Sequence, residues 1–211
     1  MPDGGASAGR VYAGRTSEQR HAGRRERLLA AALEAFARDG WEGATVTSIC
    51  REAKLSARSF YELFPSREAL FIAVADGLAE DVQTIARAAV ARDDQSPDER
   101  ARGVLGGLAR YFTDDPRRVR VALIESLATP ALRAHRSRLL RSLAEFAARL
   151  MRALHPDPDA VDLAALQLSA FLLSGGIVEA LMAAADDEPA APREALVEHL
   201  ARLYEAAATI R

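Results

Sequence analysis

Apolar residues recur three and four positions apart along most of the chain, which places them on one face of a succession of helices. The first such segment predicts a helix over residues 24–39. Gly40 ends it, because glycine readily adopts the left-handed conformation of a helix terminus. Its apolar face consists of Leu28, Leu29, Ala32, Leu33 and Phe36. Residues 1–23 show no such face and are expected to form a flexible basic arm.

Two short helices are predicted directly after the first. Thr45 is a suitable N-cap for a helix of about two turns, and Ser56 for another that runs through Leu63 and stops at Pro65. The apolar face of the earlier one holds Val46, Ile49, Cys50 and Ala53. Three helices, of which the last two are short and closely joined, have the arrangement of a helix-turn-helix, whose second member enters the major groove of DNA.

A long amphipathic helix is predicted from the cap Ser66 to about Arg92. Five further helices are separated by proline-containing breaks at residues 93–97, 114–116, 129–130, 155–158 and 186–192. The chain is therefore expected to be all-α, with about nine helices. We divide it into a helix-turn-helix domain over residues 24–70 and a larger helical domain over residues 71–211.

Composition agrees with a helical protein, since alanine and leucine are abundant and β-branched residues are few among the 211 residues, of which 49% are hydrophobic. The single cysteine, Cys50, excludes an internal disulfide and suits the reducing cytoplasm, where we expect the protein to act. No apolar signal-peptide core is found near the N-terminus. Residues 163–182 have the length of a bilayer span, but Gln167 and Glu179 favour a buried helix, so no membrane contact is expected.

Enzymatic motifs are missing from the sequence. It contains no nucleophile elbow, no P-loop and no His-Glu-x-x-His pattern. The four histidines are scattered over separate segments, so a metal site would require them to converge from distant parts of the fold. We expect neither catalysis nor a metal or other cofactor.

Charge is unevenly distributed, although the formal net charge is only −2. Six arginines precede or open the first helix, and only three acidic residues share that stretch. These arginines are Arg10, Arg15, Arg20, Arg24, Arg25 and Arg27. A local excess of positive charge attracts a polyanion even when the chain as a whole is near neutral. The N-terminal part is therefore the expected site of nucleic-acid binding.

The second short helix has the side chains that groove binding needs. Ala57, Arg58, Ser59 and Tyr61 are expected on its outward face, while Phe60 points inward. Arginine pairs bidentately with guanine, and hydroxyl groups reach base edges or phosphates. An ordinary solvated face explains the same pattern, so this observation alone leaves both readings open.

A longer pattern decides between these readings. Residues 40–46 read GWEGATV and residues 60–70 read FYELFPSREAL, with Ile49, Ala53 and Leu55 between them. This ordered, gap-free pattern resembles the DNA-binding signature of TetR-family regulators over about residues 24–71. It is far longer than a three-residue motif, which makes chance agreement improbable. The resemblance implies a homodimer that reads a palindromic operator in double-stranded DNA.

The resemblance implies DNA contacts from the two short helices and the start of the long one. The residues concerned are Thr45, Thr47, Ala57, Arg58, Ser59, Tyr61 and Arg67. Arg24 and Arg25 are expected to add phosphate or minor-groove contacts. Lys54 departs from the family, which usually has a glycine there. We expect it either to take a positive φ, at a cost of about 1 kcal/mol, or to form a slightly different turn, and to offer its charge to DNA.

The last two predicted helices have wide apolar faces that need a partner. The resemblance implies that their partner is the same pair of helices in a second subunit, so that the four helices pack as a bundle. The interface residues are expected to be Phe171, Ile177, Leu181, Leu196, Leu200 and Leu203. Gly175 and Gly176 either let helices approach closely or mark a local kink.

The resemblance also implies an effector pocket among the fifth to eighth helices, so the larger domain is expected to bind an effector and to dimerise. Candidate lining residues are Leu105, Leu108, Tyr111, Phe112, Ile124, Glu125, Phe146, Leu150, Gln167 and Leu173. Plain core packing explains each apolar one, and an interhelix hydrogen bond explains Glu125 and Gln167. Few charges lie there, which favours a small, largely apolar effector.

The mechanism implied by the resemblance is release of a repressor: the effector moves the long helix and so changes the separation of the two recognition helices. A transcriptional activator, or a regulator that answers to a protein partner, is the alternative.

Overall fold

The computed structural model describes residues 17–155, 162–185, 195, 198–199 and 202–203. This part of the chain holds eight α-helices and no strand, which confirms the all-α prediction. The ninth predicted helix, over residues 190–209, falls largely outside the described residues. No helix within these ranges is both long and apolar enough to cross a membrane.

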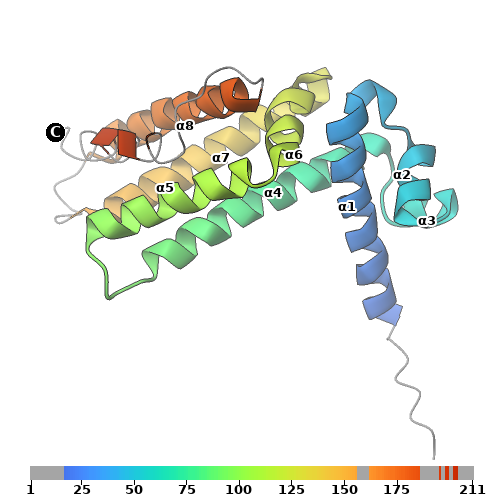
Figure 1. Cartoon of the computed structure of the whole chain (residues 1–211), viewed down its shortest axis with the longest axis horizontal. Helices are drawn as coiled ribbons and strands as arrows, with labels where there is room; N and C mark the ends of the chain where they lie inside the picture. Colours follow the sequence, from blue (N-terminus) through green and yellow to red (C-terminus); the bar gives the residue numbers. More distant parts are fainter. Residues whose placement is uncertain (1–16, 156–161, 186–194, 196–197, 200–201, 204–211) are drawn as a thin grey trace, which may run out of the picture.

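The first three helices form a unit at one end of the molecule (Figure 1). They are α1 (Ser17–Gly43), α2 (Val46–Ala53) and α3 (Ala57–Tyr61). The helix α1 begins seven residues before the predicted start, because the segment holds a single glycine and no proline, and Glu18 lies favourably in its first turn. Gly40, at φ 70°, interrupts α1, and one helical turn resumes after it.

A buried aromatic cluster holds this unit together. Phe36, Phe60 and Phe71 are at most 1% exposed. The Phe36 ring meets Phe71 edge-on at 4.9 Å between centroids, and Trp41 meets Phe71 in the same way at 5.7 Å. Because Phe71 belongs to α4 (Arg67–Val90), the start of that helix is part of the core of this three-helix unit.

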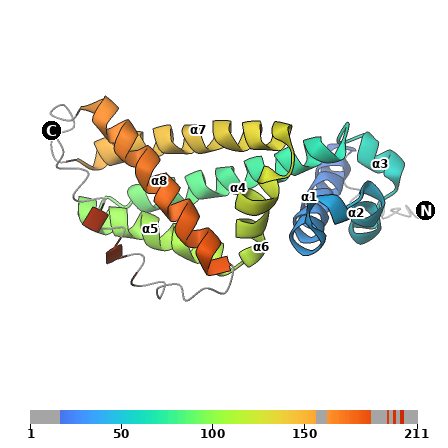
Figure 2. The same ribbon diagram turned by 90° about the horizontal axis from the view of Figure 1, so that it is seen from above.

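The rest of the chain forms a helical body (Figures 1 and 2). After α4 come α5 (Pro97–Thr113), α6 (Pro116–Val119), α7 (Pro130–Leu154) and α8 (Leu163–Ala185). Helices α4, α5 and α7 run alongside one another, and α8 crosses them diagonally. Proline occupies the first position of α5, α6 and α7, where its missing N–H leaves no helical hydrogen bond unmade.

The stretch from Arg120 to Leu127 departs from regular helix. A π-helical turn, η1 (Arg120–Ile124), passes directly into a 3-10 turn, η2 (Glu125–Leu127). The hydroxyl of Ser126 donates to the carbonyl oxygen of Ala122 at 2.7 Å inside this distortion. We call these residues the 120–127 segment. Such irregular turns recur at functional sites, where they re-aim side chains.

Close packing of α4 and α5 generates a stability prediction. A Cβ added at Gly107 would lie 2.6 Å from Cγ2 of Ile85, a β-branched side chain with little freedom to move. We expect Gly107→Ala to lower the free energy of unfolding by about 1–3 kcal/mol, as overpacking does. Urea unfolding measures this change.

The matched control is Gly77→Ala in α4, where nothing lies within 4 Å of the added Cβ. It should raise the free energy of unfolding by about 0.5–1 kcal/mol, because alanine favours helix. Equal stability of the two variants would contradict the close approach of α4 and α5.

Candidate nucleic-acid interface and effector cavity

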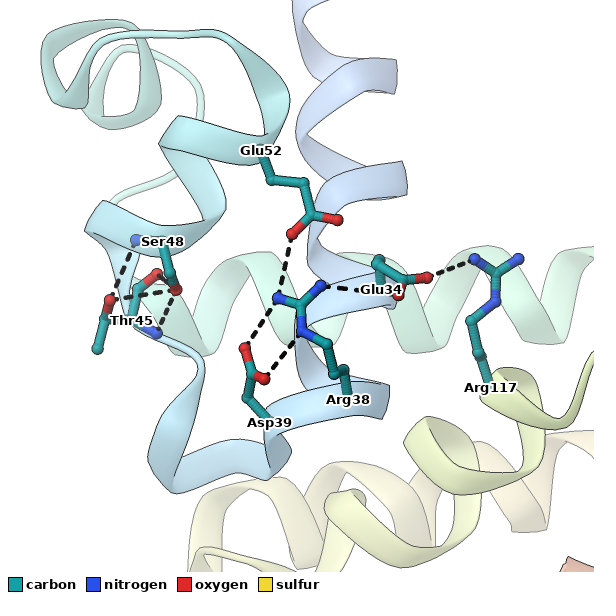
Figure 3. A network of polar contacts seen from close by, with 7 residues as sticks. All are labelled: Glu34, Arg38, Asp39, Thr45, Ser48, Glu52 and Arg117. Atoms are coloured by element: carbon teal, nitrogen blue, oxygen red, sulfur yellow. Dashed lines mark hydrogen bonds and ion pairs between the residues drawn. The ribbon is translucent and has the colours of Figure 1, made fainter.

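Hydroxyl side chains define the starts of α2 and α3. Oγ1 of Thr45 accepts from the backbone N–H of Ser48 at 3.1 Å, and Oγ of Ser48 accepts from the N–H of Thr45 at 3.0 Å (Figure 3). Ser56 caps α3 by accepting from the N–H of Ser59 at 3.1 Å. These caps fix where the two short helices begin, and the remaining free N–H groups there are suited to bind phosphate.

The turn between the two helices contains the predicted strained residue. Lys54 takes the left-handed conformation, with φ 54° and ψ 47°, as expected of a residue in the usual place of a glycine. Its N–H donates to the carbonyl oxygen of Arg51 at 3.2 Å, and the next N–H, of Leu55, donates to Cys50 at 2.9 Å. The turn therefore keeps its hydrogen bonds without a glycine.

Most of the predicted DNA-contacting side chains are exposed to solvent. The side chain of Arg58 is 90% exposed, and Tyr61 is 59% exposed. The predicted residues in the exposed class are Arg25, Thr45, Thr47, Lys54, Ala57, Arg58 and Tyr61. Phe60 is buried beneath them, so α3 presents a polar outer face on a fixed apolar base.

All four predicted arginines have partners within the chain. Nε of Arg58 donates to a carboxylate oxygen of Glu62, one turn further on, at 3.2 Å. Nη1 of Arg24 lies 3.9 Å from a carboxylate oxygen of Glu62, and the Arg25 guanidinium lies 5.6 Å from the ring centre of Phe64. Arg67 is held more firmly, as its Nη1 donates to the carbonyl oxygen of Ala44 at 2.8 Å.

The Arg67 guanidinium also lies over the Trp41 ring, 4.1 Å from its centre. In this structure Arg67 therefore fixes the loop that leads into α2. Sequence reasoning, which assigned it to phosphate, had no signal for these contacts.

An exposed polar network connects α1 with α2 and α6 (Figure 3). Arg38 donates to Asp39 at 2.9 Å and to Glu52 of α2 at 3.2 Å, and Arg117 of α6 donates to Glu34 at 2.7 Å. The hydrogen bonds from Arg38 hold the pKa of Asp39 below its usual range. Solvent screens these pairs, so they orient the helices more than they stabilise them.

Glu125 joins the two units through a better shielded contact. Its side chain is 12% exposed, and Oε2 accepts from the backbone N–H of Trp41 at 2.8 Å. Trp41 opens the helical turn after the break at Gly40, so Glu125 caps that turn from 84 positions away. Arg120 Nε lies 3.4 Å from Oε1 of the same carboxylate.

The body encloses an apolar cavity of about 240 Å³ between α4, α5, α7, α8 and the 120–127 segment. Six of the ten predicted effector residues line it, namely Leu105, Leu108, Phe112, Phe146, Leu150 and Leu173. Sequence reasoning missed the contribution of α4, including Leu78 and Val82, because the pocket was expected among the fifth to eighth helices only.

Four predicted effector residues do not line the cavity. Glu125 bonds to Trp41 instead, Gln167 is exposed on α8, and Ile124 sits in the π-helical turn outside the lining. The Tyr111 hydroxyl donates to Asp81 at 2.7 Å. Burial and this hydrogen bond raise the pKa of Tyr111 well above its usual value, which keeps the hydroxyl protonated as a donor.

One face of α8 leaves large apolar side chains in solvent. Leu168, Phe171 and Leu172 are 53–64% exposed, and nothing lies within 4 Å of a Cβ added at Gly175 or Gly176. Of the other predicted interface residues, Leu203 is 41% exposed, whereas Ile177 turns inward and lines the cavity. Leu196, Leu200 and the side chain of Leu181 lie outside the described residues.

The geometry defines a helix-turn-helix DNA-binding unit on a helical body that contains a cavity. Residues 28–74 match the family model of the bacterial regulatory proteins of the tetR family. Over these residues, which hold most of the three-helix unit and the start of α4, the chain is similar to this family.

Known proteins similar to the chain are regulators of the same kind. The transcriptional repressor NicS of Pseudomonas putida is 29% identical over 128 residues, which is 61% of this chain, and the chain spans only 59% of the length of NicS.

Solved structures share the fold at low sequence identity. The fatty acid degradation regulator FadR of Bacillus halodurans has a TM-score of 0.73 at 16% identity, with 86% of this chain and 94% of that one covered. The FadR of Bacillus subtilis in complex with stearoyl-CoA has a TM-score of 0.64 at 15% identity, with 88% and 99% covered.

The contact between Glu125 and Trp41 yields a second stability prediction. Glu125→Ala leaves a shielded backbone N–H without its acceptor, so we expect the free energy of unfolding to fall by about 1–3 kcal/mol. Urea unfolding followed by the fluorescence of Trp41, the single tryptophan, measures it.

Glu34→Ala removes the exposed partner of Arg117 and serves as control, with an expected change of at most about 0.5 kcal/mol. If both variants unfold at the same urea concentration as the unaltered protein, the junction at Glu125 does not stabilise the fold.

Proposed function

We propose that the chain is a ligand-responsive repressor that binds a palindromic operator as a homodimer and leaves it when a small, largely apolar effector binds. In this proposal residues 24–70 bind DNA, and residues 71–211 bind the effector and dimerise. The observation that carries it is the open polar face of α3 on a buried helix-turn-helix core, within the segment that matches the family model.

Geometry and charge support DNA binding by this face. Arg58 and Tyr61 project from α3, and the exposed side chains of Thr45 and Thr47 flank the capped start of α2. A recognition helix reads base edges through such side chains, while neighbouring helix starts anchor phosphates. Lys54 adds an exposed charge at the turn between them.

The exposed face of α8 supports a homodimer. Leu168, Phe171 and Leu172 are followed at helical spacing by the open positions Gly175 and Gly176, so a second helix would find both apolar area and room for close approach. Dimers place two recognition helices about one turn of DNA apart, which a palindrome requires.

Continuity between the cavity and the DNA-binding unit supports a ligand response. The helix α4 contributes Leu70, Phe71 and Val74 to the DNA-binding unit's core, and two turns later Leu78 and Val82 line the cavity. A ligand that pushes on this helix therefore acts on both units. The stearoyl-CoA bound to the Bacillus subtilis FadR, which shares this fold, is consistent with a lipid-like effector.

The 120–127 segment offers a second connection. Ala122 and Leu123 line the cavity, while Glu125, in the following turn, bonds to Trp41 of α1. A change at the cavity wall would move this carboxylate and so the capped turn that precedes α2. A hundredfold loss of operator affinity requires a coupling of about 2.7 kcal/mol, which is within the usual range.

An activator, or a regulator that responds to a protein partner, is the second candidate. A reporter gene driven from the cognate promoter distinguishes an activator from a repressor. Deletion of the gene for this protein raises reporter expression if the protein is a repressor and lowers it if the protein is an activator.

The DNA-binding proposal is tested on DNA from immediately upstream of the protein's own gene, against scrambled DNA, at two salt concentrations. We expect specific binding that weakens with salt, and a loss of about tenfold in affinity for Arg58→Ala, in line with one direct contact. Arg138→Ala, which removes an exposed arginine from α7, should leave the affinity unchanged. If the unaltered protein binds the upstream DNA and the scrambled DNA equally well, the upstream DNA contains no operator for this protein.

The dimer proposal is tested by placing a charge on the open face of α8. Phe171→Glu should convert a dimer into a monomer in analytical ultracentrifugation, because an unpaired carboxylate would be buried in the interface. Glu179→Gln, on the same helix, removes a charge and serves as control. If the Phe171→Glu protein still sediments as a dimer, this face of α8 does not form the dimer interface.

A further inference from the structure

One charged side chain interrupts the apolar wall of the cavity. Among the described residues that line it, Arg136 of α7 alone carries a charge, and Ser174 of α8 is the only other polar one. Arg136 is half-buried, and its Nε is shielded from solvent without any hydrogen-bond acceptor. A guanidinium N–H that is shielded and unpaired is unfavourable, so an acceptor supplied from outside would be stabilising.

Among the described residues, no carboxylate forms an ion pair with Arg136. The residues one turn away from Arg136 on α7 are Leu132, Arg133, Leu139 and Leu140, none of them acidic. Three carboxylates on elements that pack against α7 have other partners: Asp76 bonds to His135 at 2.8 Å, Asp81 to Tyr111 and Glu125 to Trp41. The cavity thus combines an almost wholly apolar wall with one guanidinium group whose Nε–H has no hydrogen-bond acceptor.

We propose that the effector is an anionic amphiphile, whose apolar chain fills the cavity and whose terminal carboxylate or phosphate pairs with Arg136. This inference rests on the proposed function of the cavity as an effector site. Guanidinium groups bind carboxylates and phosphates through two parallel hydrogen bonds, which a neutral hydroxyl cannot match. The half-buried position suits a head group at the edge of the cavity with the chain inside.

The competing explanation is that Arg136 only covers the cavity with its aliphatic stem and directs its charge to solvent. That arrangement would give no preference for an anion over a neutral molecule of the same chain length. The two explanations therefore differ in ligand ranking, which is measurable without knowledge of the natural effector.

The experiment titrates the full-length protein with decanoate, decyl phosphate, 1-decanol and decyltrimethylammonium, by calorimetry and by Trp41 fluorescence. These probes share one apolar chain and differ in the head group. We expect at least one anion to bind about tenfold or more tightly than 1-decanol, and the cation to bind most weakly. The ranking of decanoate against decyl phosphate identifies which anion fits.

Variants then assign this preference to one residue. Arg136→Gln should bring the anion and 1-decanol to within about twofold of each other while leaving the affinity for 1-decanol unchanged. Arg138→Gln, on the exposed side of the same helix, should keep the full preference. Arg136→Lys keeps the positive charge but cannot form two parallel hydrogen bonds, so it should keep part of the preference for the anion. This variant tests the inference if the Arg136→Gln protein does not fold.

The outcomes separate the inference from the function on which it rests. If 1-decanol binds as tightly as the anions, or if Arg136→Gln keeps the preference, the cavity stands as an effector site but the anionic inference is overturned. If none of the probes binds, both the inference and the effector role of the cavity are rejected, while the DNA-binding proposal is unaffected.

Discussion

The hydrogen bond from the Trp41 N–H to the Glu125 carboxylate is the contact on which the arrangement of the two units depends. Gly40 breaks α1 and leaves the N–H of Trp41 without a helical acceptor, and Glu125 supplies one from the body. The Trp41 ring in turn packs in the aromatic core and under Arg67, which holds the loop before α2. One shielded carboxylate thus connects the cavity wall with the start of the helix-turn-helix.

Two continuous elements are shared by the cavity and the DNA-binding unit. The helix α4 carries core residues of one and lining residues of the other, and the 120–127 segment lines the cavity on one side and contacts α1 on the other. A packed interior changes between discrete arrangements rather than deforming smoothly, so a ligand in the cavity acts on both elements together. Their connection gives a structural basis for the proposed ligand response.

Local patterns in the sequence were sufficient for the helix caps and the order of the first helices, but not for the start of α1, the irregular 120–127 segment or contacts between distant residues. The caps at Thr45, Ser56 and Ser66, the strained turn at Lys54 and the inward Phe60 were all predicted, because each depends on neighbours a few positions away. The partners of Arg67 and Glu125 lie 23 and 84 positions distant, beyond the reach of periodicity. The same limit explains why Ile177 was assigned to an interface although it faces the cavity.

The most direct test of the account is reciprocal linkage between the two sites. The affinity for operator DNA is measured with and without a saturating amount of the tightest-binding anionic amphiphile, and the affinity for that amphiphile with and without DNA. The account predicts that each ligand weakens the other by the same factor, since coupling free energy belongs to the pair. Amphiphile binding in the cavity that leaves operator affinity unchanged would contradict a ligand-responsive regulator of this kind.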